Sequence, residues 1–134
     1  MLGKKPTHLW RYPEGSGKLF LETWLEVGTL SLTAKTLYAR GTKNRTGGVP
    51  HVGSIRQVVN RWIVNNMSEA REMLLANDYD RLSDDKEWAA FTIPRANACL
   101  KESVMFRWLL KHGFLEYARE LKYIPEDYGK DRTI

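Results

Sequence analysis

Between residues 55 and 63, apolar side chains recur with the spacing of an α-helix. Ile55, Val58, Val59, Trp62 and Ile63 stand at positions i, i+3, i+4, i+7 and i+8. This spacing places all five on one side of a helix and predicts a continuous apolar stripe packed against a core. Elsewhere the chain has no internal repeat and no convincing strand-like alternation of apolar and polar residues. We therefore expect an all-α fold.

Turn and capping residues mark the ends of two helices that come before this stripe. Apolar spacing predicts a helix over 18–27, and Gly28 is expected to end it by accepting a left-handed backbone. Ser31 is expected to cap a second helix over 32–40, which Gly41 ends. The first two helices are thus joined by a short turn.

The second half contains similar helix signals. Asn66 followed by Glu69 is a variant capping box, and Ser83 is expected to cap a short acidic helix. Thr92 and Pro94 fit the first turn of a long apolar helix. The helices expected here are 66–76, the acidic helix after Ser83, 93–111 and, after an interruption at Gly113, 114–123.

The charges of the chain are divided unevenly along its length. Residues 28–68 contain six lysines and arginines and no aspartate or glutamate. Ten basic and three acidic residues give residues 1–65 a net charge of +7, whereas eleven basic and thirteen acidic residues give 66–134 a net charge of −2. A surface of one sign attracts polyanions, so nucleic acid is the first partner that the charge pattern indicates.

Composition excludes several other classes of protein. With 43% apolar and 28% charged residues, the chain is typical of a globular protein, and no run approaches the roughly 20 apolar residues of a membrane span. Residues 1–6 carry charge without an apolar segment behind it, which does not fit a secretory signal. Cys99 is the single cysteine, which rules out an internal disulfide and indicates a reducing, cytoplasmic location.

No group of residues predicts catalysis, a metal or a cofactor. The segment 14–18, Glu-Gly-Ser-Gly-Lys, lacks the first glycine and the final Ser or Thr of a phosphate loop. Capping or solvation is the expected role of the aspartates at 78, 80, 84 and 85. We therefore expect neither an enzyme nor a small-molecule substrate, and no zinc site forms from one cysteine and the distant histidines His8, His51 and His112.

The first three expected helices, over residues 16–66, resemble a helix-turn-helix DNA-binding domain. The resemblance rests on the short turn at Gly28 and on a third helix whose outer face carries arginine, glutamine and asparagine. It implies that one helix enters the major groove, where arginine pairs with guanine and asparagine or glutamine pairs with adenine. Unlike the compact motif, this chain has a basic, turn-rich segment over 41–50, expected to form a flexible loop or a small hairpin.

Two placements of the recognition helix follow from this insert. If the turn at Gly28 is the turn of the motif, the helix over 31–40 reads bases through Ser31, Thr33, Lys35 and Thr36, and the 41–50 loop acts as a wing. Otherwise the helix over 52–65 reads them, and Lys43 and Arg45 contact phosphate or a neighbouring minor groove. We favour the second placement because its outward face has more groups capable of paired hydrogen bonds.

Together these patterns predict a helix-turn-helix-like subdomain over 1–66 packed on a helical packing or oligomerisation subdomain over 67–134. The expected function is non-catalytic binding of duplex DNA, as in transcription regulators or, by architecture alone, phage small terminase subunits. Apolar residues on nearly all sides of 104–110 indicate either a central helix or a homo-oligomer contact. An adaptor that docks its basic face on an acidic protein and an RNA-binding protein stay open as alternatives. The expected nucleic-acid contacts are Lys35, Arg40, Lys43, Arg45, Ser54, Arg56, Gln57, Asn60 and Arg61.

Overall fold

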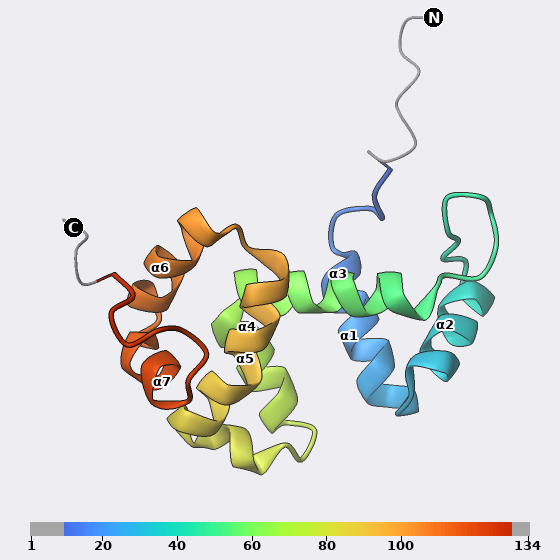
Figure 1. Cartoon of the computed structure of the whole chain (residues 1–134). Helices are drawn as coiled ribbons and strands as arrows, with labels where there is room; N and C mark the ends of the chain where they lie inside the picture. Colours follow the sequence, from blue (N-terminus) through green and yellow to red (C-terminus); the bar gives the residue numbers. More distant parts are fainter. Residues whose placement is uncertain (1–9, 130–134) are drawn as a thin grey trace, which may run out of the picture. The chain divides into compact units, whose positions relative to one another are not determined.

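The computed structural model describes residues 10–129 and is drawn in Figure 1. Over this range the chain forms seven α-helices, one 3-10 helix and no strand, which confirms the all-α prediction. The segment 1–6, interpreted above as unlike a secretory signal, and His8 lie outside the described residues. The chain divides into two compact units, residues 1–62 and 63–134.

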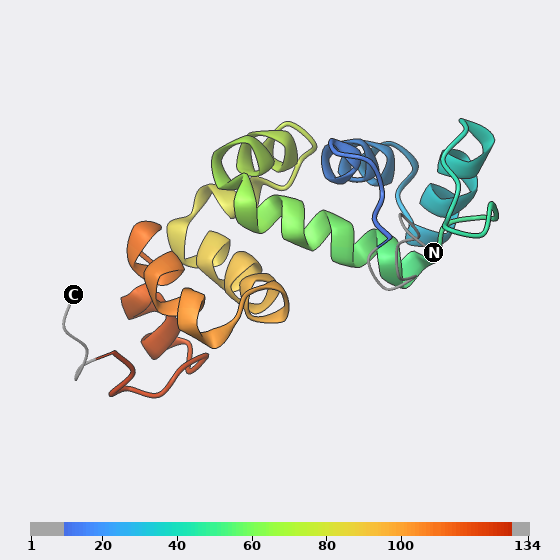
Figure 2. The ribbon, with the colours of Figure 1, turned by 90° about the horizontal axis from the view of Figure 1, so that it is seen from above.

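Three helices build the first unit. α1 (Ser16–Val27) and α2 (Leu30–Ala39) pack against each other, and most of α3 (Val52–Asn65) belongs to the same unit. Figure 2 shows α3 as one unbroken helix that begins where the loop after α2 ends. The buried residues of this unit are mostly apolar and include Phe20, Leu21, Thr23, Thr33, Ala34, Leu37, Ile55 and Val59.

The ends of α1 and α2 match the predicted glycines but not the predicted cap. Gly28 ends α1 with φ 92°, and Gly41 follows α2 with φ 101°. The left-handed backbone at Gly41 lets the Thr42 amide reach the Leu37 carbonyl at 2.8 Å, which satisfies a carbonyl at the helix end. The N-cap of α2 is Thr29, not Ser31, because the Thr29 hydroxyl accepts from the Leu32 amide.

α1 and α3 approach closely at Gly17. A Cβ atom built on Gly17 would lie 2.3 Å from Cβ and 2.7 Å from Cγ of Trp62. Only a residue without a side chain fits this position, which explains a glycine in the first turn of a helix. Ile55, Val59 and Ile63 of the predicted stripe are buried, whereas Val58 and Trp62 are only half-buried.

The second unit contains the remaining helices. They are α4 (Met67–Leu75), η2 (Asp80–Ser83), α5 (Asp85–Cys99), α6 (Glu102–Lys111) and α7 (Leu115–Glu120). α5 packs against η2, α6 and α7, and η2 also packs against α4. Asn66 occupies the N-cap of α4 as predicted, but its side chain does not accept a capping hydrogen bond from the first turn, so this half of the predicted capping box does not form. Asp84, not Ser83, caps α5 by accepting from the Glu87 amide at 3.0 Å.

Pro94 lies inside α5 and does not begin a new helix. Buried residues stand on both sides of it and form one mostly apolar face that crosses the proline, namely Trp88, Ala89, Thr92, Ile93 and Ala96. Thr92 donates its hydroxyl to the Trp88 carbonyl at 2.9 Å, a contact of helix interiors. Burial of this face therefore outweighs the hydrogen bond that proline cannot donate. The break comes at Leu100, which has an extended backbone.

α6 places most of its apolar residues inside the second unit. Met105, Phe106, Trp108 and Leu109 are buried, and Leu110 is the exposed apolar residue of this helix at 38%. The indole N–H of Trp108 donates to the Val64 carbonyl at 3.1 Å. Packing inside the unit thus accounts for most of the apolar character that the sequence shows over 104–110.

Candidate nucleic-acid interface

One side chain, Asn44, determines the shape of the loop between α2 and α3. Its Oδ1 accepts from the Thr46 amide (2.9 Å), the Thr46 hydroxyl (2.9 Å) and the Gly48 amide (2.8 Å). Its Nδ2 donates to the Val49 carbonyl at 3.0 Å, and its backbone amide donates to the Gly48 carbonyl at 2.9 Å. The segment over 41–50 was predicted to form a flexible loop or a small hairpin. It is a compact loop that the side-chain amide of Asn44 holds closed.

Replacing Asn44 by alanine is expected to open the loop because it removes four side-chain hydrogen bonds. Each contributes about 0.5–1.5 kcal/mol net. We expect the amide protons of Thr46 and Gly48 to exchange at least roughly tenfold faster, the result of losing about 1.4 kcal/mol of protection. Asn44→Asp is the control, since it keeps the acceptor oxygen and loses only the bond to Val49. Unchanged exchange in Asn44→Ala, measured by NMR, would show that the backbone alone holds the loop.

The outer face of α3 presents a smaller polar surface than the sequence indicated. Arg56, Gln57 and Arg61 are exposed, whereas Ser54 and Asn60 are half-buried. Gln57 and Arg61 stand four positions apart, as do Arg56 and Asn60, so each pair lies on adjacent turns of one side. Two guanidinium groups and one amide therefore share the exposed part of α3.

The two candidates on α2 differ in their surroundings. Lys35 is exposed. Arg40 forms two hydrogen bonds with the Glu26 carboxylate, at 3.1 and 2.9 Å, and so joins the end of α2 to the end of α1. This hydrogen bond and the charge of Arg40 lower the pKa of Glu26, and the carboxylate raises the pKa of Arg40. Arg40 thus has an internal partner that a phosphate would have to displace.

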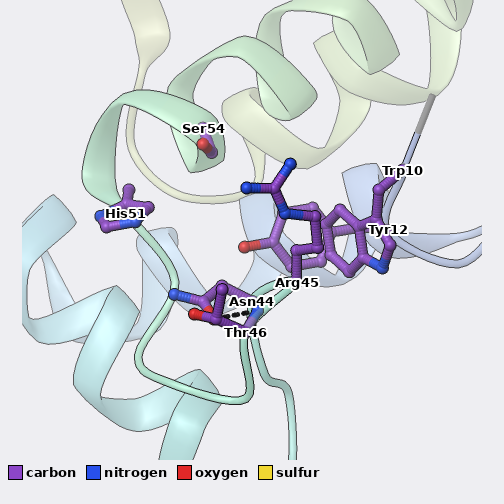
Figure 3. Close-up of a pocket in the computed structure, with 7 residues that line it drawn as sticks. All are labelled: Trp10, Tyr12, Asn44, Arg45, Thr46, His51 and Ser54. Atoms are coloured by element: carbon purple, nitrogen blue, oxygen red, sulfur yellow. Dashed lines mark hydrogen bonds between the residues drawn. The ribbon is translucent and has the colours of Figure 1, made fainter. Parts of the chain in front are cut away.

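A hollow of about 210 Å³ lies beside the loop and the start of α3. Figure 3 shows that three segments supply its lining, namely Trp10 and Tyr12 of the entry segment, residues 44–46 of the loop, and His51 with Ser54. Tyr12 packs edge-on against buried Phe20 with ring centroids 5.0 Å apart, and burial raises the pKa of its phenol. The core of the unit therefore anchors one wall of the hollow.

Trp10 and Tyr12 are the residues of this hollow that sequence reasoning missed. Their rings meet edge-on at 4.7 Å, and Trp10 is 40% exposed. The available signal was two aromatic residues on either side of Arg11 within a basic segment. An aromatic surface beside cations is typical of sites that stack nucleobases.

The acidic residues of the first unit lie outside the loop and α3. Residues 1–62 contain ten lysines and arginines against three glutamates, a net charge of +7. All three glutamates belong to α1 or the turn before it, and Glu26 is already paired with Arg40. The loop and α3 therefore contain basic residues and no acidic residue of their own.

The second unit has a larger hollow of about 420 Å³ with a different character. Arg71 lies against it, stacked on Trp88 at 5.5 Å and bonded to Asp85 and to the carbonyls of Leu82 and Ser83, each at 2.9 Å. Burial, with a contribution from neighbouring Lys111, lowers the pKa of His112 in its wall. Asp84 and Asp85, for which the sequence predicts capping or solvation, act as a helix cap and an ion-pair partner.

Comparison with models of protein families, with curated proteins and with solved structures finds no match to this chain. Among the helices of residues 10–129, none has the length and apolar content that crossing a membrane requires. Within the same range, no three His, Cys, Asp or Glu side chains are grouped as metal ligands would be. The argument for function therefore depends on the geometry and charge of the first unit.

Proposed function

We propose that the chain binds duplex DNA without catalysing a reaction, through the loop over 41–50 and the outer face of α3. The observation that carries this proposal is the charge of that surface. Residues 28–68 contain six basic side chains and no acidic one, and of the six Arg40 is paired with Glu26 of α1. Ordinary solvated surfaces mix the two signs, whereas phosphate-binding surfaces do not.

α3 is the better candidate for the major groove. Arg56 and Gln57 are exposed and can each form two hydrogen bonds with one base. On α2, by contrast, Thr33 is fully buried and donates its hydroxyl to the Thr29 carbonyl at 2.6 Å. Thr33 is therefore withdrawn from the set proposed to read bases. The helix-turn-helix resemblance is compatible with either helix as the reader, so the exposed polar groups of α3 carry this placement.

Lys43 and Arg45 are assigned to the phosphate backbone. Both are exposed on the loop that Asn44 holds closed, so an ordered backbone carries the two side chains. Contacts to phosphate add affinity without selecting a sequence, because every nucleotide carries the same group. In this proposal the loop supplies affinity, and α3 supplies the preference for one site.

The experiment measures the DNA affinity of two sets of variants. Each is tested on a target site obtained by selection and on unrelated DNA. Arg56→Ala is expected to reduce the preference for the target by about 1–3 kcal/mol. Lys43→Ala with Arg45→Ala is expected to weaken binding equally on both DNAs and to reduce the salt slope by about 2. Lys101→Ala, an exposed lysine of the second unit, is the control.

Three outcomes would change the assignment. Equal loss on both DNAs in Arg56→Ala would move that residue to the backbone. Unchanged affinity in the double variant would exclude the loop. Tighter binding to an RNA duplex of equal length would favour the RNA-binding alternative, and no binding to either would leave the basic face as a docking surface for an acidic protein.

A further inference from the structure

The hollow beside the loop combines an aromatic surface with polar and cationic side chains. One wall is aromatic, formed by the edge-on pair Trp10 and Tyr12. The other walls carry a guanidinium, an imidazole and hydroxyl groups, from Arg45, His51 and the neighbouring Thr46 and Ser54 (Figure 3). A flat apolar group and an anion can therefore be held at the same time.

The size of the hollow limits what it takes. About 210 Å³ is less than the roughly 300–1,000 Å³ of pockets that enclose a whole drug-sized molecule. The hollow thus suits one part of a larger ligand, such as a single base with its phosphate. Asn44 is committed to the loop by its own hydrogen bonds, so it shapes the wall and leaves the polar contacts to its neighbours.

The position of the hollow connects it with the proposed DNA surface. The same loop that carries Lys43 and the same first turn of α3 that precedes Arg56 form two of its walls. A strand that leaves a duplex bound on this surface would therefore lie close to the hollow and to Trp10. Its base would no longer be covered by neighbouring bases and would gain a stacking partner.

We infer that this hollow binds one unstacked nucleotide of a single-stranded DNA extension, with its base on Trp10 and its phosphate near Arg45 and His51. The inference rests on the proposed function, since the duplex brings the strand to the hollow. Ser54 supplies a hydroxyl donor to the sugar or phosphate, whereas the Thr46 hydroxyl, which donates its proton to Asn44, offers only an acceptor. The chain would accordingly prefer a junction of duplex and single strand to a blunt duplex.

Fluorescence anisotropy tests this with a blunt duplex and with the same duplex carrying a single-stranded extension of about four nucleotides. The extension, placed in turn at each strand end, includes 2-aminopurine, whose fluorescence reports stacking on an indole. We expect the extension to raise affinity about tenfold, because stacking one base on an aromatic ring gives roughly a five- to hundredfold gain. In Trp10→Ala this gain and the fluorescence change are expected to disappear, while blunt-duplex affinity stays the same.

Two variants control for general effects. Trp10→Phe keeps an aromatic face and is expected to retain most of the gain. Tyr38→Ala removes an equally exposed aromatic ring on α2, outside the hollow, and should retain all of it. Tyr12 and its contact with Phe20 are left unchanged in every variant, so the core wall of the hollow stays in place.

The outcomes separate this inference from the proposed function. The blunt duplex can bind while the extension adds no affinity, or adds affinity that Trp10→Ala retains. In either case the hollow is not a nucleotide site and the proposed function stands. If the blunt duplex fails to bind while the extended DNA binds in a Trp10-dependent way, the nucleotide site stands and the duplex proposal falls. If neither DNA binds, both are overturned.

Discussion

Replacing Gly17 by alanine is expected to lower the free energy of unfolding of the first unit by about 3 kcal/mol, the upper part of the range for overpacked sites. The new Cβ would lie 2.3 Å from Cβ of Trp62. That atom is fixed to the backbone of α3 and cannot rotate away, so α1 and α3 must move apart. Urea unfolding followed by tryptophan fluorescence measures the loss.

Two further variants show whether the cause is the close approach of the helices. Gly53→Ala, on α3, meets no atom within 4 Å and is expected to be neutral or to stabilise by about 0.5–1 kcal/mol. Adding Trp62→Ala to Gly17→Ala should not restore stability, because alanine keeps the Cβ atom in the contact. Wild-type stability in Gly17→Ala would contradict the packing of α1 on α3.

Trp108→Ala is expected to cost the second unit about 3–5 kcal/mol, as for other buried aromatic residues. Trp108 is buried, and its ring meets Phe114 edge-on at 5.7 Å. Its N–H also donates to the Val64 carbonyl at 3.1 Å. Val64 lies in the last turn of α3, where carbonyls lack partners within the helix. The substitution therefore removes both core volume and the partner of a buried carbonyl.

Trp108→Phe separates these two contributions. It keeps an aromatic ring but leaves the Val64 carbonyl without its donor, and we expect a loss of about 1–3 kcal/mol. Thermal unfolding by circular dichroism compares the two variants. An equal loss in both would assign the stability to the hydrogen bond, and no loss in Trp108→Phe would assign it to packing alone.

Helices and their glycine ends could be predicted from the sequence because these signals are local. The stripe that contains Ile55 and Val59 requires only the period of a helix, and Gly28 and Gly41 end helices through their own backbone freedom. Pro94 shows where such local signals fail. Its local pattern fits a helix start equally well, and only the burial of α5 on neighbouring helices determines that the helix continues through it.

In the candidate site, too, local features could be predicted from the sequence and features that depend on packing could not. The exposed side chains of α3 could be located from helical spacing around Ile55. The pairing of Arg40 with Glu26 could not, since the two residues are 14 positions apart and meet only when α1 and α2 pack. The hollow likewise requires Trp10, the loop and the start of α3 to come together in three dimensions.

The most direct test of the DNA-binding proposal is the affinity of the purified chain for short duplex DNA at several salt concentrations, with an RNA duplex of equal length alongside. Each neutralised phosphate contributes about −0.9 to the slope of log affinity against log salt. Four or five phosphate contacts from the basic surface predict a slope of about −4, with DNA preferred to RNA. Absence of binding at low salt would contradict the account.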